Sequence, residues 1–128
     1  MEKKQRIAAF DISKRRIGIA FSDEDCNFVA YSKTIFISNQ GDAEKKLKIL
    51  FQEYKPSLSF IGLPSARNDY FIKNFTHNLR HIFTPYRFVN EDFSTAEAKY
   101  IIQGASMVNS YDAIDSLVAR SILMSQIL

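Results

Sequence analysis

Residues 10–22 read FDISKRRIGIAFS and place an aspartate where one apolar segment ends, followed by a basic turn and a second apolar segment. The flanking runs, residues 6–10 and 17–22, have the length and apolar content of buried strands, and the short connection between them predicts a hairpin. Residues 29–37, VAYSKTIFI, are rich in β-branched and aromatic side chains and predict a third strand, antiparallel because its connection is also short. The chain therefore begins with a three-stranded meander.

Beyond the meander, the apolar residues recur every three or four positions instead of every two. This spacing predicts helices over residues 42–54 and 71–83, with Pro56 closing the first of them. Short apolar runs at residues 58–63 and 86–89 predict the fourth and fifth strands. Because each of these strands follows a helical crossover, we expect both to lie parallel in the sheet.

The last part of the chain predicts two more helices. Residues 94–97, STAE, form a capping box that begins a helix ending near Gln103, with Gly104 as the stop. The final helix runs from about Ser110 to the C-terminus. The predicted fold class is α/β: a single ribonuclease H-like domain over residues 1–128, with a mixed five-stranded sheet (antiparallel strands 1–3, then parallel strands 4 and 5), flanked by helices and centred on strand one.

Composition excludes several classes of protein. Of 128 residues, 46% are hydrophobic and 24% are charged, a balance typical of folded rather than disordered chains. No apolar run is long enough to span a membrane, and the start MEKKQRIAAFD lacks a signal region, so we expect no export and no membrane partner. The single cysteine, Cys26, cannot form an internal disulfide, which fits a cytoplasmic location. A net charge of +3 permits a polyanionic partner without requiring one.

Three acids stand out by their context: Asp11 ends strand one, Glu91 follows strand five, and Asp115 lies on the apolar face of the last helix. A carboxylate on a buried face is costly unless it is paired, hydrogen-bonded or metal-bound. Carboxyl ends of parallel strands share one edge, so Asp11 and Glu91 are expected at a common rim that the last helix can reach. Clustered oxygen ligands select Mg²⁺ or Mn²⁺, which can activate water against a phosphodiester. For each acid alone, a salt bridge or a helix cap is the alternative.

The basic turn Lys14, Arg15 and Arg16 is expected beside these acids, where it would hold phosphates. Other charged groups have simpler interpretations. Asp112 is either an additional ligand or a group that interacts with the helix dipole. Residues 23–25 predict a solvated turn. His77 and His81 share their helix with Lys73 and Arg80, and this face is expected to be solvated or at most an auxiliary basic patch.

Four blocks of the sequence match, in order, the motifs of a known family. Residues 11–23, DISKRRIGIAFSD, resemble its opening pattern DxGxKRIGxAxSD, and residues 62–64 are its GLP. Residues 90–98, NEDFSTAEA, match DER(L/F)(S/T)TxEA, and residues 114–123, IDSLVARSIL, match the closing VDxxAAxxIL helix. The chain thus resembles the YqgF family, also called RuvX. These ribonuclease H-like proteins are described as Holliday-junction resolvases and as nucleases that mature the 5′ end of pre-16S rRNA.

The resemblance implies that Asp11, Glu91 and Asp115 are the catalytic acids and bind Mg²⁺ or Mn²⁺. Arg67, in the loop after GLP, is assigned with the basic turn to nucleic-acid binding. The implied function is a metal-dependent nuclease, a hydrolase of phosphodiester bonds in structured nucleic acid, acting in 5′-end processing of pre-16S rRNA and so in ribosome biogenesis. The expected partners are structured RNA, branched DNA and ribosome precursors, with the chain a monomer or a homodimer.

The sequence also departs from the family pattern. Ser13 replaces a glycine, residues 90–92 read Asn-Glu-Asp instead of Asp-Glu-Arg, and the loop after GLP lacks its usual glycine. These changes motivate an alternative: a weakened or inactive RNA- or ribosome-binding module on the same fold. A Holliday-junction resolvase is a further alternative. A sugar-kinase or actin-like ATPase would require a second domain, for which 128 residues leave no room.

Overall fold

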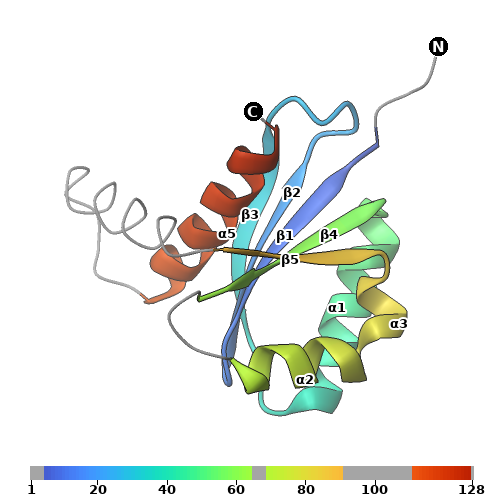
Figure 1. Ribbon diagram of the computed structural model, residues 1–128. Helices are drawn as coiled ribbons and strands as arrows, with labels where there is room; N and C mark the ends of the chain where they lie inside the picture. The colour runs from blue at the N-terminus through green and yellow to red at the C-terminus, as the bar shows by residue number, and fades with distance from the viewer. Residues whose placement is uncertain (1–4, 65–68, 91–110, 128) are drawn as a thin grey trace.

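The computed structural model describes residues 5–64, 69–90 and 111–127, with side chains from residue 116 onward in the last range (Figure 1). All five predicted strands are present within these ranges. In chain order the described elements are β1 (Ile7–Ile12), β2 (Arg16–Ser22), β3 (Val29–Phe36), α1 (Gln40–Tyr54), β4 (Leu58–Leu63), α2 (Tyr70–Asn78), α3 (Arg80–Phe83), β5 (Tyr86–Asn90) and α5 (Tyr111–Ile127). The predicted helix that follows residues 94–97 lies outside the described residues.

The five strands form one sheet in the order β3-β2-β1-β4-β5. β2 is antiparallel to both β1 and β3, whereas β4 is parallel to both β1 and β5. The predicted meander, the two parallel additions and the central place of β1 are therefore confirmed. Because β1, β4 and β5 run in one direction, their carboxyl ends lie at one edge of the sheet, called here the carboxyl rim: Ile12, Leu63 and Asn90.

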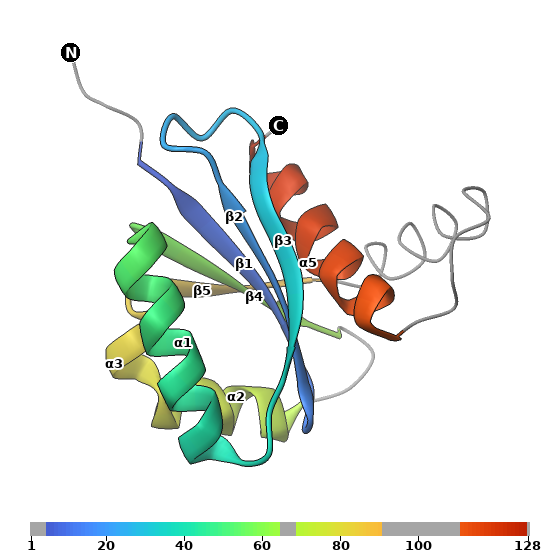
Figure 2. The same ribbon diagram turned by 180° about the vertical axis from the view of Figure 1, so that it is seen from behind.

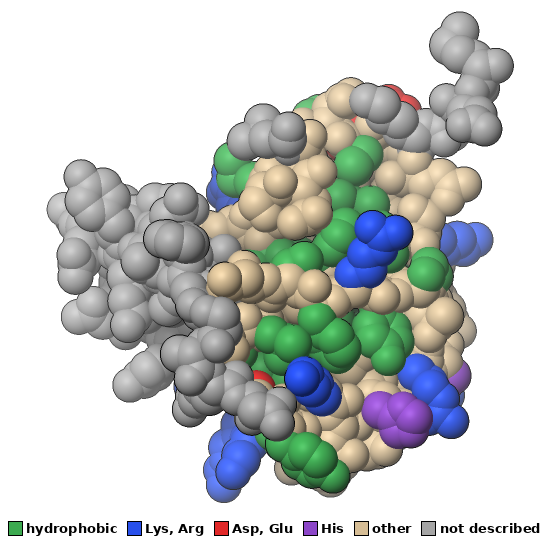
Figure 3. Space-filling view, in the orientation of Figure 1, with side chains coloured by type: hydrophobic (Ala, Val, Ile, Leu, Met, Phe, Trp, Pro, Cys, Tyr) green, Lys and Arg blue, Asp and Glu red, His purple; other side chains and the backbone are tan. Residues whose placement is uncertain are grey.

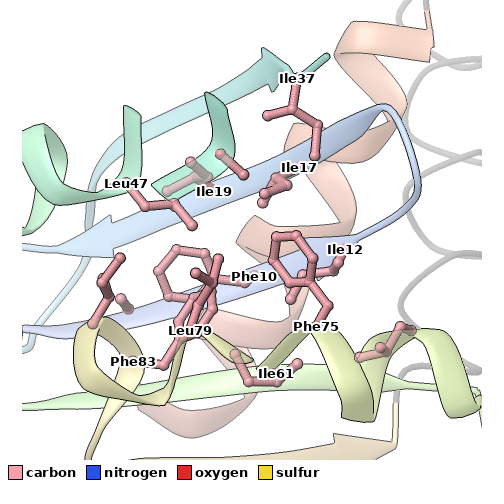
Figure 4. Close-up of a cluster of buried hydrophobic side chains, with 14 of the residues drawn as sticks. Phe10, Ile12, Ile17, Ile19, Ile37, Leu47, Ile61, Phe75, Leu79 and Phe83 are labelled. Carbon is pink, nitrogen blue, oxygen red and sulfur yellow. The ribbon is translucent and has the colours of Figure 1, made fainter. Parts of the chain in front are cut away.

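Helices α1, α2 and α3 cover one face of the sheet, and α5 covers the other (Figures 1 and 2). The side chains of β1 alternate between the two faces. Phe10 belongs to the core under α1–α3 (Figure 4), where its ring stacks on Phe51 at a centroid distance of 5.6 Å and meets Phe83 edge-on at 5.1 Å. Ala9 belongs to the core under α5. Each fully buried ring of this kind contributes about 1.5–3 kcal/mol of hydrophobic stabilisation.

The core under α5 is built from small strand residues and branched helix residues. Ala9 and Ala20 are fully buried, so the helix can approach the sheet closely. The predicted apolar face of the last helix is confirmed, since all its members are at most 2% exposed: Val118, Ala119 and Ile122. Within the described ranges, no helix is both long enough and apolar enough to cross a bilayer.

Local polar contacts set the helix boundaries. α1 begins two residues earlier than predicted because Asn39 caps it, its side chain accepting the Asp42 N–H at 2.8 Å. The helix ends at Tyr54 and is capped by Lys55, whose left-handed backbone (φ 49°) precedes Pro56.

The prediction of one continuous helix over residues 71–83 was wrong. The chain leaves helical geometry at Leu79 (φ −110°, ψ 23°), which separates α2 from α3. Two features explain the break. The buried Thr76 hydroxyl donates to the Ile72 carbonyl at 2.7 Å, a contact that bends helices. Leu79 itself is 1% exposed and belongs to the core, so the irregular turn keeps an apolar side chain inside.

Candidate functional site

Asp11 is the second-last residue of the central strand, β1. Its backbone pairs with Gly18 of β2, and its side chain is half-buried. Since Ala9 faces α5 and strand side chains alternate, Asp11 also projects from the α5 face. The sequence placed this acid where the strand leaves the core, and the structure puts it at the carboxyl rim but still inside the sheet.

Glycines flank Asp11 on the two neighbouring strands. Gly18 is its partner on β2, and Gly62 of β4 is the next residue after Ile61, the partner of Phe10. Both glycines are buried. At the register level of Asp11, the two flanking strands therefore have no side chain beyond the backbone. Thr34 of β3, which pairs with Gly18, continues this row and is 3% exposed.

Helix α5 crosses this face with its amino-terminal half toward the carboxyl rim (Figures 1 and 2). Ser32 of β3 donates its hydroxyl hydrogen to the Ser116 carbonyl at 3.1 Å. Ser32 pairs with Ala20, and Ala20 with Ala9, so Ser116 lies level with the residue two positions before Asp11. Asp115 directly precedes Ser116, but its side chain is outside the described part of the chain. The structure thus brings the backbone of α5 to the face and the edge that Asp11 occupies.

Two further predicted site residues lie outside the described part of the chain. Glu91 comes directly after Asn90, the last residue of β5, and Arg67 falls in the gap between β4 and α2. Among the residues that are described, no three His, Cys, Asp or Glu side chains gather closely enough to hold a metal ion. The convergence of Asp11, Glu91 and Asp115 on a divalent cation therefore stays a prediction.

The basic turn between β1 and β2 is held tightly by its own backbone. The N–H and the hydroxyl of Ser13 both donate to the Arg16 carbonyl, at 2.9 and 2.8 Å. The Ile37 N–H donates to the Arg15 carbonyl at 2.9 Å, which ties the turn to the end of β3. Ser13 does not occupy the left-handed region, so the glycine of the family pattern is not needed here. Lys14 and Arg15 are exposed on this fixed turn, and Arg16 is half-buried.

A groove of about 310 Å³ opens at the ends of β4 and β5, on the side of α2. Lys73 of α2 contributes a cation to it, and Asp69 caps α2 by accepting the Ile72 N–H at 3.2 Å. Figure 3 shows apolar side chains between β5 and α2 with basic side chains over both elements. The groove is lined by Leu63, Pro64, Asp69, Lys73, Phe88, Val89 and Asn90.

Two predicted solvated segments have structural roles away from the rim. The Asp23 carboxylate accepts the backbone N–H groups of Asn27 and Phe28, at 2.6 and 2.9 Å, and so organises the β2–β3 turn. These hydrogen bonds lower the pKa of Asp23, and the bond from the Phe28 N–H has the largest effect. His81 lies 2.7 Å from Glu44, and this hydrogen bond is the main cause that lowers the pKa of Glu44. The prediction of simple solvation was incomplete for both segments.

Comparison with known proteins identifies the family. The family model described as "RuvX: Holliday junction resolvase" matches residues 5–127. The chain belongs to the RuvX family. A protein of Sulfurihydrogenibium sp. (strain YO3AOP1) named "Putative pre-16S rRNA nuclease" is 33% identical over 129 residues, which span 94% of this chain and 88% of that protein. The resemblance to RuvX seen in the four sequence blocks is thereby confirmed.

Solved structures give the fold of this RuvX chain. Thermus thermophilus RuvC in complex with a Holliday junction substrate aligns with a TM-score of 0.58 at 6% identity, covering 95% of each chain. Fowlpox virus resolvase, solved with a substrate Holliday junction, aligns with a TM-score of 0.51 at 15% identity, covering 94% of this chain and 99% of that one. At such low identity the likeness is one of fold, and it confirms the ribonuclease H-like class with strand order 3-2-1-4-5.

The sequence reading missed two features of this RuvX chain. The glycines beside Asp11 occur in the quoted motifs, yet only the sheet register shows that Gly18 and Gly62 border one carboxylate. Lys73 was expected on a face that is solvated or at most an auxiliary basic patch, and the structure shows that it lines the groove beside β5. The signal that could have found it was its place on the first turn of a helix that follows a strand end.

Proposed function

We propose that this RuvX-family protein is a divalent-metal-dependent nuclease that hydrolyses phosphodiester bonds in structured RNA, with the 5′ end of pre-16S rRNA as its substrate. The observation that carries this proposal is the setting of Asp11. It is a half-buried carboxylate on the central strand, bordered by glycines and next to a turn of three basic residues. The similarity to the Sulfurihydrogenibium protein supports the choice of substrate.

The oxygen ligands available fit a hard cation. Asp11, Glu91 and Asp115 would supply carboxylate oxygens, the donor type that Mg²⁺ and Mn²⁺ prefer. Bound ions of this kind lower the pKa of water and stabilise both the attacking and the leaving oxygen of a phosphodiester. On the protein side, the backbone of Asp11 pairs with β2, and the residue before it pairs with both β2 and β4, so the position of Asp11 is well fixed.

The basic turn would position the substrate. Lys14 and Arg15 project from a rigid turn at the carboxyl rim and would bind phosphates of the backbone, which sets register without reading sequence. Arg16 lies two residues before Gly18 on β2, so its side chain leaves the same face as Asp11. Its planar guanidinium can bind a phosphate through two hydrogen bonds.

A binding module without catalysis is the second candidate. It is favoured by Asn90, an amide at the end of β5 where the family pattern has an acid. Loss of a negative group there would weaken a cation site, while the basic turn would still bind nucleic acid. This candidate predicts salt-sensitive RNA binding with no product.

The deciding experiment is a cleavage assay on a 5′-extended fragment of pre-16S rRNA, with a four-way DNA junction as the competing substrate. Wild-type protein is incubated with Mg²⁺ or Mn²⁺, and in EDTA. We expect cleavage of the RNA only with metal, and none by Asp11→Asn. The matched control is Asp25→Asn, which changes an exposed aspartate in the β2–β3 turn and should cut normally.

The remaining outcomes separate the alternatives. Cleavage in EDTA, or by Asp11→Asn, would contradict the metal mechanism. Cleavage of the junction and not the RNA would make the protein a resolvase. Tight binding of RNA by wild type and by Asp11→Asn, with no cleavage product from either, would favour the binding module.

A further inference from the structure

An exposed aromatic ring ends strand β3 at the carboxyl rim. Phe36 is 57% exposed, although the residues on either side of it, Ile35 and Ile37, pack on the core under α1–α3. A single exposed ring is unremarkable on its own. Its partner and its place relative to Asp11 make it informative.

The sheet register places Phe36 directly opposite Arg16. Ser32, which bonds to α5, shares the face of Phe36 because the two lie four residues apart on one strand. Arg16 and Gly18 lie two residues apart on β2, so they too share one face. Phe36 and Arg16 therefore form a cross-strand pair on the face of Asp11, one side-chain row farther toward the rim.

This pair is close to the candidate catalytic acid. Asp11, Gly18 and Thr34 form one row across the sheet, and the Arg16–Phe36 pair forms the next. Successive rows on a face are two residues apart, which is about 6.6 Å along a strand. Phe36 also lies two strands from Asp11, about 9.6 Å across the sheet, so the two positions are about 12 Å apart. A base one or two nucleotides from a phosphate at the proposed metal site of Asp11 would reach the ring.

The backbone under the pair is fixed on both strands. The Arg16 carbonyl accepts two bonds from Ser13, at 2.9 and 2.8 Å. The Phe36 carbonyl accepts a bond from the Lys46 side chain at 2.6 Å, which anchors the end of β3 to α1. A site on two anchored strands is preorganised, because little mobility is lost when a ligand binds.

We propose that Phe36 and Arg16 form a stacking platform for an unpaired base of the substrate, one or two nucleotides from the phosphate that the proposed metal site at Asp11 would bind. The proposal rests on the proposed nuclease function and adds that the substrate is single-stranded beside the cleavage point. Unpaired bases stack on aromatic rings and on guanidinium planes, and this stacking tolerates any base. Bases within a continuous duplex are already stacked and cannot use the platform.

The charge of the surroundings favours a nucleic acid over a protein as the occupant. The turn that carries Arg16 also presents Lys14 and Arg15, and residues 13–16 contain no acid. An apolar ring bordered by basic residues matches an aromatic base joined to phosphates. The competing occupant of an exposed ring, a second copy of this chain, is tested below.

The test is RNA binding measured by fluorescence anisotropy in the Asp11→Asn background with Mg²⁺, so that affinity is read without cleavage. One RNA is a duplex with a single-stranded extension, and the other is fully paired. We expect Phe36→Ala to weaken binding of the extended RNA about 10-fold or more while leaving the paired RNA unchanged. Phe36→Trp should retain affinity because it keeps a stacking surface.

The matched control is Phe28→Ala. Phe28 is equally apolar and 62% exposed, but it lies in the β2–β3 turn at the other end of the sheet, so we expect no change. The salt dependence supplies a second readout. Removal of a stacking ring should leave the slope of log affinity against log salt unchanged, whereas Arg16→Ala should reduce it by about 0.7–0.9.

Three results would overturn the platform: equal losses on both RNAs, a Phe28→Ala loss as large as that of Phe36→Ala, or a Phe36→Ala change in sedimentation from dimer to monomer. The last would make this face a contact between copies. Failure of the nuclease proposal is distinguishable. If the wild-type protein cuts no RNA, but Phe36→Ala still weakens binding of the extended RNA, the platform proposal stands and the nuclease proposal fails.

Discussion

The two faces of the sheet are built from alternate residues of the same strands and have different compositions. Under α1–α3, strand β1 contributes Phe10 to a cluster of stacked and edge-on aromatic rings. Under α5, the same strand contributes Ala9 and then Asp11, with glycines beside the acid. One face is filled to the rim with buried apolar side chains, and the other ends in Asp11, Arg16 and the exposed ring of Phe36. Because successive side chains of a strand point to opposite faces, one strand can supply a stabilising core on one face and a candidate site on the other.

The largest expected effect contrasts two adjacent residues of β1. Phe10→Ala should lower the free energy of unfolding by about 3–5 kcal/mol, because a fully buried ring leaves a cavity. Asp11→Asn should change it by less than about 1 kcal/mol, because the new side chain has the same shape. Urea unfolding of both variants measures this difference. If Asp11→Asn were as destabilising as Phe10→Ala, the claim that one face supplies stability and the other supplies the site would be wrong.

An intermediate effect is expected at the turn that borders the site. Lys14→Ala and Arg15→Ala should leave the melting temperature unchanged, because both side chains are exposed. Each should reduce the salt slope of RNA binding by about 0.7–0.9 if it contacts one phosphate. Lys45→Ala, which removes an exposed lysine from α1 on the opposite face, is the matched control. A control slope that falls equally would show that binding is spread over the whole surface.

The smallest expected effect concerns the acid at the other end of the sheet. The backbone bond from Phe28 and its companions hold the pKa of Asp23 below its ordinary value of 3.8. A lowered folded-state pKa stabilises the fold at pH values above 3.8, and this contribution is lost as the pH falls through the folded-state pKa. Asp23→Asn keeps the hydrogen-bond acceptor and removes the charge, so its stability should depend less on pH over that window.

Urea unfolding at pH 6 and at pH 3 measures the Asp23 effect, with Asp25→Asn as the control. RNA binding by Asp23→Asn should match wild type, since Asp23 lies away from the carboxyl rim. A loss of binding would mean that this end of the sheet also contacts nucleic acid, and the comparison of the faces would then need a third surface.

Much of the fold was predictable because it depends on local spacing. The apolar runs at residues 58–63 and 29–37 marked strands, and helical spacing marked α1 and α5. The break at Leu79 was not predictable, since it depends on a buried hydroxyl bond from Thr76 and on which side chain the core accepts. The role of Asp23 was missed because its partners are backbone groups that any sequence supplies.

The sequence alone determined the antiparallel meander, the two later strands and the position of Asp11 near the end of β1, because periodicity and connection length are properties of consecutive residues. The central place of β1 was expected only because this order of elements fits the ribonuclease H-like fold. Only the tertiary structure decided which residues border Asp11. Gly62 and the Arg16–Phe36 pair reach its face through strand register, and register depends on hydrogen bonds between segments far apart in the chain.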